Sequence, residues 1–248
     1  MLAIIGGTGL ANLANLVITH RQVMRTPFGE PSGALTFGTI KDQDVLFLAR
    51  HGYGHTIPPH KVNYRANMIA LRDAGATRIV SVSSVGGITD EFTPGTLVVP
   101  HQIIDYTHSR DMSYFDGLEH TQMHVDFTHP YSAPLRQQIL EAAKQAGVAC
   151  RDGGVYGATQ GPRLDTAAEI DRCERDGAQM VGMTGMPEAI LARELELEYA
   201  TLAAVVNDAS GRRTSRDGVR LEAVAEVMPA IMSKVRSLLE SVVECNAE

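Results

Sequence analysis

Residues 78–87 read RIVSVSSVGG, a β-branched run that ends in two serines and two glycines. Apolar residues alternate with small ones over residues 79–83, which predicts a buried strand. The SSVGG that follows predicts the end of this strand, and its hydroxyls and exposed amides can hold an oxyanion. It lacks the GxSxG pattern of serine hydrolases, so it does not indicate a nucleophilic serine.

Short apolar segments alternate with helical patterns on both sides of this stretch. We expect strands at residues 3–5, 45–49, 79–83, 96–99, 155–158, 180–183 and 201–207. We expect helices at residues 63–74, 133–146, 166–176 and 187–195, and a C-terminal helix whose apolar stripe runs from Leu221 to Val242, with Pro229 as a kink or as its start. The alternation predicts a single α/β domain over residues 1–248, with a central mixed, mostly parallel sheet flanked by helices.

The composition is that of an ordinary globular protein and excludes several classes. Of the 248 residues 44% are hydrophobic, and the formal net charge of −7 argues against nucleic acid as a partner, because such a partner needs a basic face. No apolar run reaches the roughly 18 residues that span a membrane, and the first ten residues predict a buried strand rather than a secretory leader. The three widely spaced cysteines form no CxxC pair, which favours a reducing, cytoplasmic location.

A glycine-rich turn, Gly6-Gly7-Thr8-Gly9, follows the first predicted strand. Its glycines allow close backbone approach and Thr8 adds a hydroxyl, so the turn can cradle an oxyanion. It is not a dinucleotide fingerprint, because Asn12 stands where the third glycine would be. Taken alone, such a turn is as compatible with a structural role as with a functional one.

Arg50 and His51 follow the strand at residues 45–49. An arginine at the mouth of a buried strand needs an anionic partner, and its planar fork matches phosphate oxygens. A structural ion pair explains an isolated arginine equally well. The nearby histidines His51, His55 and His60 lie in a Gly/Pro-rich loop without the i, i+4 pairing of zinc helices, so no metal site is expected.

The segment Met183-Thr184-Gly185-Met186-Pro187 joins a strand to a helix whose N-terminus favours an anion. Its methionines suit either a sugar contact or simple core filling. Together with the three other strand ends, it predicts a phosphate-sized anion site assembled from distant segments. Since no cofactor motif, activated nucleophile or metal cluster accompanies this site, the anion is a candidate reactant.

Seven motifs stand in the order found in one known family. They are IIGGTGL, ARHGxxH, HKVNYRAN, SVGG with a later PG, QGPRL, MTGMPE and the VVN strand, and they run from about Ile4 to Asn207. The chain therefore resembles the methylthioadenosine/purine-nucleoside phosphorylase family, the trimeric nucleoside phosphorylases, and within it the bacterial branch that acts on 5′-methylthioinosine. The resemblance implies an α/β nucleoside phosphorylase fold, with neither a metal nor an organic cofactor.

The resemblance also implies which residues form the site. Phosphate would be held by Thr8, Arg50, His51, Ser83, Ser84 and Thr184. Methylthioadenosine enzymes usually carry Thr-Ala where this chain has Ser83-Ser84, which keeps a hydroxyl at the first position. Met183 would lie against the ribose, and Leu164 would stand beside the purine, where many relatives have phenylalanine. His124 matches a histidine lent across a subunit boundary, which implies a homotrimer with active sites at the interfaces.

The base preference follows from Asn207 and Ala209, where relatives acting on 6-aminopurines place aspartates. An asparagine can donate to a 6-carbonyl oxygen and also bond N7, whereas a carboxylate only accepts unless it is protonated. This pair favours a 6-oxopurine. The intervening Asp208 should point to the opposite face of its strand, unless the turn breaks that alternation.

The sequence thus predicts phosphorolysis of S-methyl-5′-thioinosine to hypoxanthine and 5-methylthioribose 1-phosphate, with Asn207 and Arg50 as catalytic residues. A general 6-oxopurine nucleoside phosphorylase stays open, because His124 can donate to a 5′-hydroxyl, and so does a methylthioadenosine phosphorylase. The alternatives of another class are a nucleoside hydrolase and a non-catalytic nucleotide-binding module. Residues 210–219 form either a lid or a solvated loop.

Overall fold

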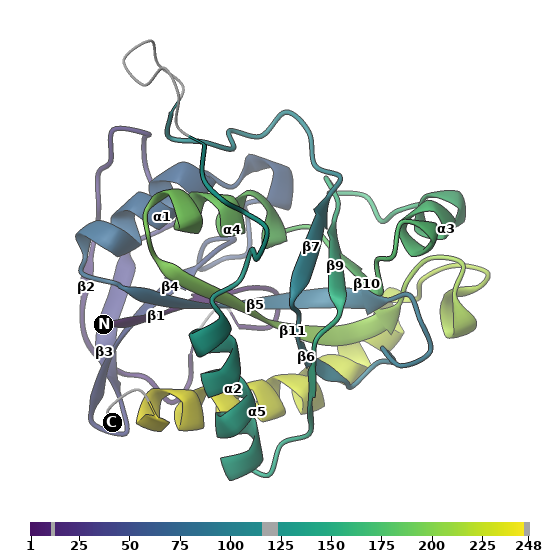
Figure 1. The fold of residues 1–248 in the computed structure, drawn as a ribbon. Helices are drawn as coiled ribbons and strands as arrows, with labels where there is room; N and C mark the ends of the chain where they lie inside the picture. The colour runs from purple at the N-terminus through teal and green to yellow at the C-terminus, as the bar shows by residue number, and fades with distance from the viewer. Residues whose placement is uncertain (11–12, 116–123, 246–248) are drawn as a thin grey trace.

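A computed structural model of the chain describes residues 1–10, 13–115 and 124–245. An eleven-stranded sheet forms its centre and helices cover both faces (Figure 1). The strands are β1 (Leu2–Gly6), β2 (Val17–Gln22), β3 (Leu35–Ile40), β4 (Gln43–Ala49), β5 (Arg78–Gly87), β6 (Leu97–Val99), β7 (Gln102–Asp105), β8 (Cys150–Asp152), β9 (Val155–Ala158), β10 (Met180–Gly182) and β11 (Glu198–Asp208). The α-helices are α1 (Tyr64–Asp73), α2 (Ala133–Gln145), α3 (Ala167–Arg175), α4 (Gly185–Glu194) and α5 (Leu221–Cys245).

The strand at residues 78–87 is the centre of the sheet. β5 pairs in parallel with β1 and β11, and antiparallel with β10. The main path runs β2-β3-β4-β1-β5-β10-β9-β7, and β6 and β8 continue outward from β11. The sheet is mixed and its central pairings are parallel, so the predicted α/β architecture is confirmed.

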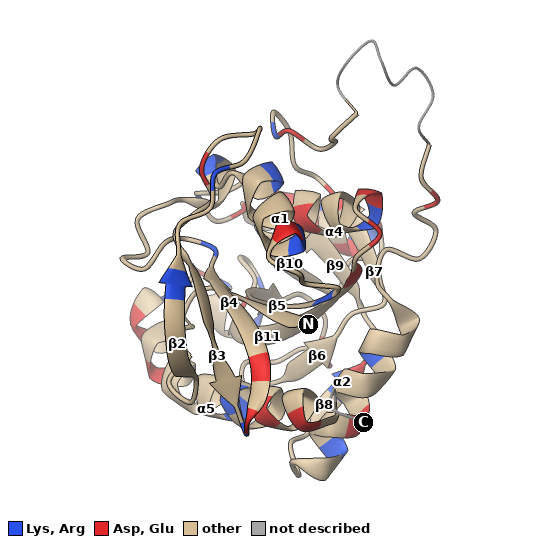
Figure 2. Ribbon diagram, turned by 90° about the vertical axis from the view of Figure 1, so that its left-hand side faces the viewer, with Lys and Arg blue, Asp and Glu red and all other residues tan. Residues whose placement is uncertain are grey.

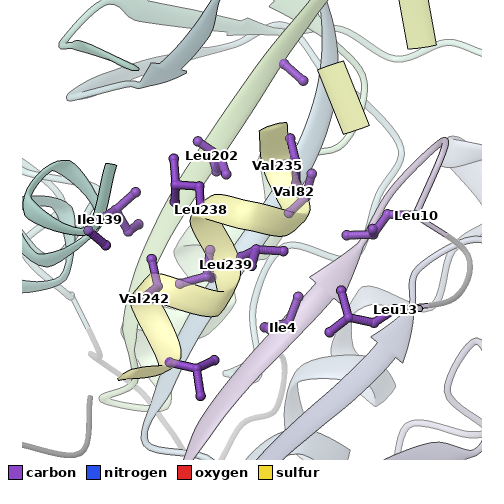
Figure 3. Close-up of a cluster of buried hydrophobic side chains, with 14 of the residues drawn as sticks. Ile4, Leu10, Leu13, Val82, Ile139, Leu202, Val235, Leu238, Leu239 and Val242 are labelled. Atoms are coloured by element: carbon purple, nitrogen blue, oxygen red, sulfur yellow. The ribbon is translucent and has the colours of Figure 1, made fainter. Parts of the chain in front are cut away.

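Helices α1 and α4 pack together on one face of the sheet, and α2 and α5 on the other (Figure 1). On the second face, Val235, Leu238 and Leu239 of α5 lie against strand residues such as Ile4 and Leu202 (Figure 3). The central strands are buried on both faces, which explains why they read as continuous apolar runs. In Figure 2, the positions of acidic and basic residues are interspersed along the ribbon of the described helices and loops.

The C-terminal helix departs from the expectations at its first turn. The helix begins at Leu221 and includes Pro229, so the proline does not mark its start. Leu221, the first residue of the expected apolar stripe, is 68% exposed. Val224 and Met228 are partly buried and pack against the core, and the fully buried residues of the stripe begin at Ile231.

The predicted end of the central strand is also wrong. Ser83 and Ser84 lie inside β5, which continues to Gly87 because β11 pairs with it along its whole length. Gly87 is required there, since a Cβ at this position would lie 1.6 Å from the carbonyl oxygen of Phe92. The prediction also missed β2, β3, β7 and β8. β2 is exposed throughout, and β7 and β8 have only four and three residues, so their apolar signal is weak.

Candidate active site

One cavity of about 430 Å³ lies where several strands end, and it collects residues that are far apart in the sequence. Nine of the eleven predicted site residues line it: Thr8, Arg50, His51, Ser84, Leu164, Met183, Thr184, Asn207 and Ala209. Ser83 and His124 are not in its lining. We name the two ends of the cavity after the ligands predicted for them. The anion end comprises the residues after β1 and β4 with Ser84 and Thr184, and the base end lies around Asn207.

Arg50 is fully buried at the anion end, and a carboxylate fixes its guanidinium. Nε and Nη2 of Arg50 donate to the two carboxylate oxygens of Glu188 at 2.5 and 3.1 Å. Nη2 also donates to Ser81 Oγ at 2.5 Å, and Nη1 to the carbonyl oxygen of Val82 at 3.0 Å. Burial alone would lower the pKa of Arg50, but the charge and hydrogen bonds of Glu188 raise it above its usual value. The structural ion pair is therefore present and takes two of the five N–H groups of Arg50, and the phosphate contact predicted for Arg50 stays a prediction.

Glu188 is the main site residue that the sequence prediction missed. Its carboxylate is fully buried, and it also accepts hydrogen bonds from Ser81 Oγ at 2.8 Å and Tyr199 Oη at 2.9 Å. A signal was present in the sequence: a glutamate at the start of an apolar helix must be paired if that helix is buried. Glu188 belongs to the MTGMPE motif, but within this motif the sequence predicted ligand contacts only for Met183 and Thr184.

Four of the five guanidinium N–H groups of Arg50 have acceptors among the described residues, which leaves one on Nη1. Nη1 lies against the glycine turn after β1. A Cβ at Gly7 would be 2.8 Å from Nη1 and 2.7 Å from the carbonyl oxygen of Val82. Gly7 is therefore needed for the turn to come this close to the guanidinium.

His51 is a neutral imidazole at neutral pH. Burial, followed by the charge of Arg50, lowers the pKa of His51 to about 4. Its Nδ1–H donates to the carbonyl oxygen of Ile57 at 2.8 Å, so Nε2 carries the lone pair. A neutral Nε2 can accept a hydrogen bond from a P–OH group but cannot donate to a phosphate oxygen.

Hydroxyl groups supply the remaining donors of the anion end. Thr184 is the N-cap of α4, yet its side chain makes no capping hydrogen bond, so its hydroxyl is not committed to the helix. Ser83 lies behind it, 1% exposed, with the two hydroxyl oxygens 3.2 Å apart. Ser84 Oγ donates to the carbonyl oxygen of Thr8 at 3.2 Å. Ser83 is thus placed to orient Thr184, while Thr8, Ser84 and Thr184 line the cavity.

Asn207 and Ala209 flank Gly86 at the base end. Asn207 Nδ2 donates to the carbonyl oxygen of Asp208 at 2.7 Å, which fixes the plane of the amide. The carboxylate of Asp208 is outside the cavity lining and accepts from Arg213 Nε at 2.8 Å. The alternation expected for Asp208 therefore holds, even though β11 carries an irregularity between Val205 and Asn207.

The mouth of the cavity is apolar and open. Leu164 and Leu221 both line it, although they are 46% and 68% exposed. Asp165, which the sequence analysis did not single out, lies beside Leu164, accepts from Thr159 Oγ1 at 3.2 Å, and has its pKa raised by burial. The two leucines leave room at the mouth for a further covering group.

The segment 210–219 borders the cavity, because Ser210 and Val219 line it, so the role of the segment as a lid stays a prediction. Arg212 donates to Asp171 and Glu174 of α3 at 2.9 and 2.6 Å, which ties the segment to that helix. A short 3₁₀ helix, Arg213–Ser215, follows. His124 is described and exposed on a different loop, so the role predicted for it in a partner subunit stays a prediction.

Comparison with known proteins agrees with this geometry. The sequence pattern that defines the phosphorylase superfamily matches residues 1–244. The chain belongs to the phosphorylase superfamily. A probable S-methyl-5′-thioinosine phosphorylase of Pseudomonas syringae pv. tomato is 50% identical over 248 residues, covering 98% of each chain. The 6-oxopurine nucleoside phosphorylase of Pyrococcus furiosus is 46% identical over 215 residues, covering 85% of this chain and 80% of its own.

The solved structures agree on the fold. Methylthioadenosine phosphorylase from Schistosoma mansoni in complex with adenine superposes with a TM-score of 0.93 at 30% identity, covering 100% of this chain and 92% of the other. Among the described residues of this phosphorylase superfamily member, no three His, Cys, Asp or Glu side chains form a group able to hold a metal ion. Within the same residues, no helix has both the length and the apolar character needed to cross a membrane.

Proposed function

We propose that this enzyme cleaves S-methyl-5′-thioinosine with inorganic phosphate, giving hypoxanthine and 5-methylthioribose 1-phosphate. One observation carries the proposal: anion donors and a base-reading amide, from segments far apart in the sequence, line a single cavity. The names of relatives at about 50% identity support the methylthio substrate. The anion donors support phosphate as the second substrate.

In the proposed reaction a phosphate oxygen attacks C1′ of the sugar while the C1′–N9 bond breaks. The bonding electrons leave with the purine, and positive charge develops on the sugar ring. Phosphate held by Thr8, Ser84, Thr184 and Nη1 of Arg50 stabilises that charge and then forms the new C–O bond. Arg50 and Glu188 are oppositely charged, so the pair positions the anion more than it attracts it. The step needs no covalent enzyme intermediate and no added cofactor.

Base selection arises as the purine departs with the bonding electrons and takes a proton from solvent water on N7, which leaves the base neutral. Departing hypoxanthine presents a donor at N7–H and an acceptor at O6, which match Oδ1 and the second Nδ2–H of Asn207. Departing adenine presents two donors, N7–H and the 6-amino group, and one of them meets the amide N–H. A mismatched buried polar pair costs about 1–3 kcal/mol, so Asn207 favours the 6-oxopurine. Asp165 can additionally accept the N1–H that 6-oxopurines carry.

We further propose a cytoplasmic homotrimer in which His124 of a neighbouring subunit closes the 5′ end of each site. The exposure of His124 in the single chain supports this arrangement. A histidine there can also donate to a 5′-hydroxyl. The Pyrococcus relative named as a 6-oxopurine nucleoside phosphorylase keeps inosine and guanosine as the second candidate substrates. Either reaction returns a free purine, as purine salvage requires.

The test is a side-by-side measurement of kcat/KM for methylthioinosine, methylthioadenosine, inosine and guanosine, each with and without phosphate. We expect methylthioinosine to rank first and cleavage to require phosphate. Undiminished cleavage without phosphate would make the enzyme a hydrolase. Absence of turnover with all four nucleosides would leave only a binding module, and inosine ranking first would favour the general 6-oxopurine enzyme.

A further inference from the structure

Arg110 lies in the loop after β7, half-buried behind the cavity and outside its lining. Its guanidinium contacts the segment that forms one cavity wall. Nη2 donates to the carbonyl oxygen of Gln160 at 2.7 Å and to that of Thr159 at 3.4 Å. Nε donates to the side-chain oxygen of Gln160 at 3.0 Å. Residues 159–165, the purine wall, are thus fixed to Arg110 at their first two residues.

The same guanidinium reaches the neighbouring segment of the lining, which follows β10 as residues 159–165 follow β9. Nη1 of Arg110 donates to the carbonyl oxygens of Met183 and Met186 at 2.9 and 2.6 Å. These two carbonyls bracket Thr184, the N-cap of α4, and Met183 itself lines the cavity. We call residues 183–186 the sugar-phosphate wall. Arg110 is therefore bonded to the main chain of two neighbouring segments that line one cavity.

A third lining segment joins through a tyrosine. Nη1 of Arg110 also lies 3.3 Å from Tyr64 Oη, which donates to the carbonyl oxygen of Pro59 at 2.8 Å. Pro59 lines the cavity, and the guanidinium stacks over the Tyr64 ring at 5.4 Å. No carboxylate pairs with Arg110 among the described residues. Its charge is directed at carbonyl dipoles of the cavity walls.

We propose that Arg110 is a positioning residue that sets the spacing between the purine wall and the sugar-phosphate wall. A planar fork with five N–H groups bridges carbonyls on both walls at once, which the single ammonium of lysine does not do. Reacting groups must be held to within fractions of an ångström, and a misplacement of about 1 Å costs on the order of 100-fold in rate. Arg110 therefore acts on catalysis without touching the substrate.

The experiment compares Arg110→Lys with Arg136→Lys. Arg136 is a matched control, because it is also half-buried and also donates to main-chain carbonyl oxygens. These are the carbonyls of Pro100 at 2.8 Å and Val99 at 3.2 Å. Arg136 does not line the cavity. Hydrogen exchange, measured by mass spectrometry on the intact enzyme, reports how firmly the amides of the two walls are held. It needs no measurement of enzyme activity. We expect faster exchange in residues 159–165 and 183–186 for Arg110→Lys only.

The kinetic part rests on the proposed function. Arg110→Lys should lower kcat/KM for the nucleoside about 10- to 100-fold, whereas Arg136→Lys should stay within about threefold of wild type. Tyr64→Phe removes only the third link and should cause a smaller loss, with its melting temperature close to wild type. Wild-type enzyme without turnover would refute the proposed function alone, since the exchange comparison still decides the role of Arg110. Equal exchange and equal kinetics in the two lysine variants would overturn the proposal.

Discussion

The two ends of the cavity are built in opposite ways. At the anion end, Arg50 and Glu188 are both fully buried, and all carboxylate oxygens of Glu188 have donors. At the base end, Leu164 and Leu221 are about half and two-thirds exposed, and Asn207 is the one amide side chain among the described lining residues. The anion end is completed within one chain. The base end is open, so substrate preference is adjustable there without disturbing the core.

The difference has a physical cause. A buried charge must be paired and hydrogen-bonded. Replacing one charged residue of the anion end therefore leaves its buried partner without a counter-charge. An exposed apolar side chain needs no such partner. Substitutions at the anion end should therefore cost stability and phosphate use together, whereas those at the base end should change selectivity at little cost.

The largest effect is expected for Glu188→Gln. The variant leaves Arg50 buried without a counter-charge, and breaking a buried ion pair costs about 3–5 kcal/mol. Urea unfolding measures the loss. Glu141→Gln is the control, because its pair with Lys144 at 3.1 Å is exposed and contributes well under about 1 kcal/mol. Equal midpoints for the two variants would mean that the anion end is not the rigid one.

Next in size is the acid sensitivity of His51. Its pKa is lowered from 6.5 to about 4 in the fold, so between these pH values the unfolded chain binds a proton that the native state does not. The free energy of unfolding should therefore fall as pH drops through this window, by at most about 3 kcal/mol. Unfolding curves at several pH values should show a flatter dependence for His51→Gln than for wild type. His20→Gln is the control, because His20 is exposed on β2 and lies outside the cavity lining. If His51→Gln follows the wild type as closely as the control does, His51 is not the responsible group.

Arg50→Lys should have a smaller effect than Glu188→Gln, because it keeps a positive charge at the anion end. The ammonium can still pair with Glu188, but the Nη1–H next to Gly7 is lost. Hydrogen bonds to charged groups contribute about 1.5–3 kcal/mol, so KM for phosphate should rise about 10- to 100-fold. KM for the nucleoside should change little. A variant whose two KM values rise equally would show that Arg50 supports the whole cavity and not its anion end.

The sequence predicted the residues that line the anion end better than the residues behind them that hold them in place. The glycine turn at Gly7, the arginine after β4 and the hydroxyl of Ser84 are visible as local patterns, because these residue types are unusual in or directly after buried apolar strands. Glu188 was missed because its role depends on Arg50, 138 positions away, and no local pattern encodes that pairing. The extent of β5 was misjudged for the same reason, since its partner β11 extends it through a sequence that looks like a turn.

Asn207→Asp should change the base preference with the smallest change in stability. The carboxylate accepts from both N7–H and the 6-amino group of a departing adenine, but faces O6 of hypoxanthine as a second acceptor. Two buried acceptors that face each other without a donor cost about 1–3 kcal/mol. The ratio of kcat/KM for methylthioadenosine over methylthioinosine should therefore rise about 10- to 100-fold. Asp208→Asn is the neighbouring control: its carboxylate bonds Arg213 outside the cavity, so it should lose stability and keep the wild-type ratio. If both variants leave the ratio unchanged, the base is read elsewhere, and Asp165 becomes the residue to replace.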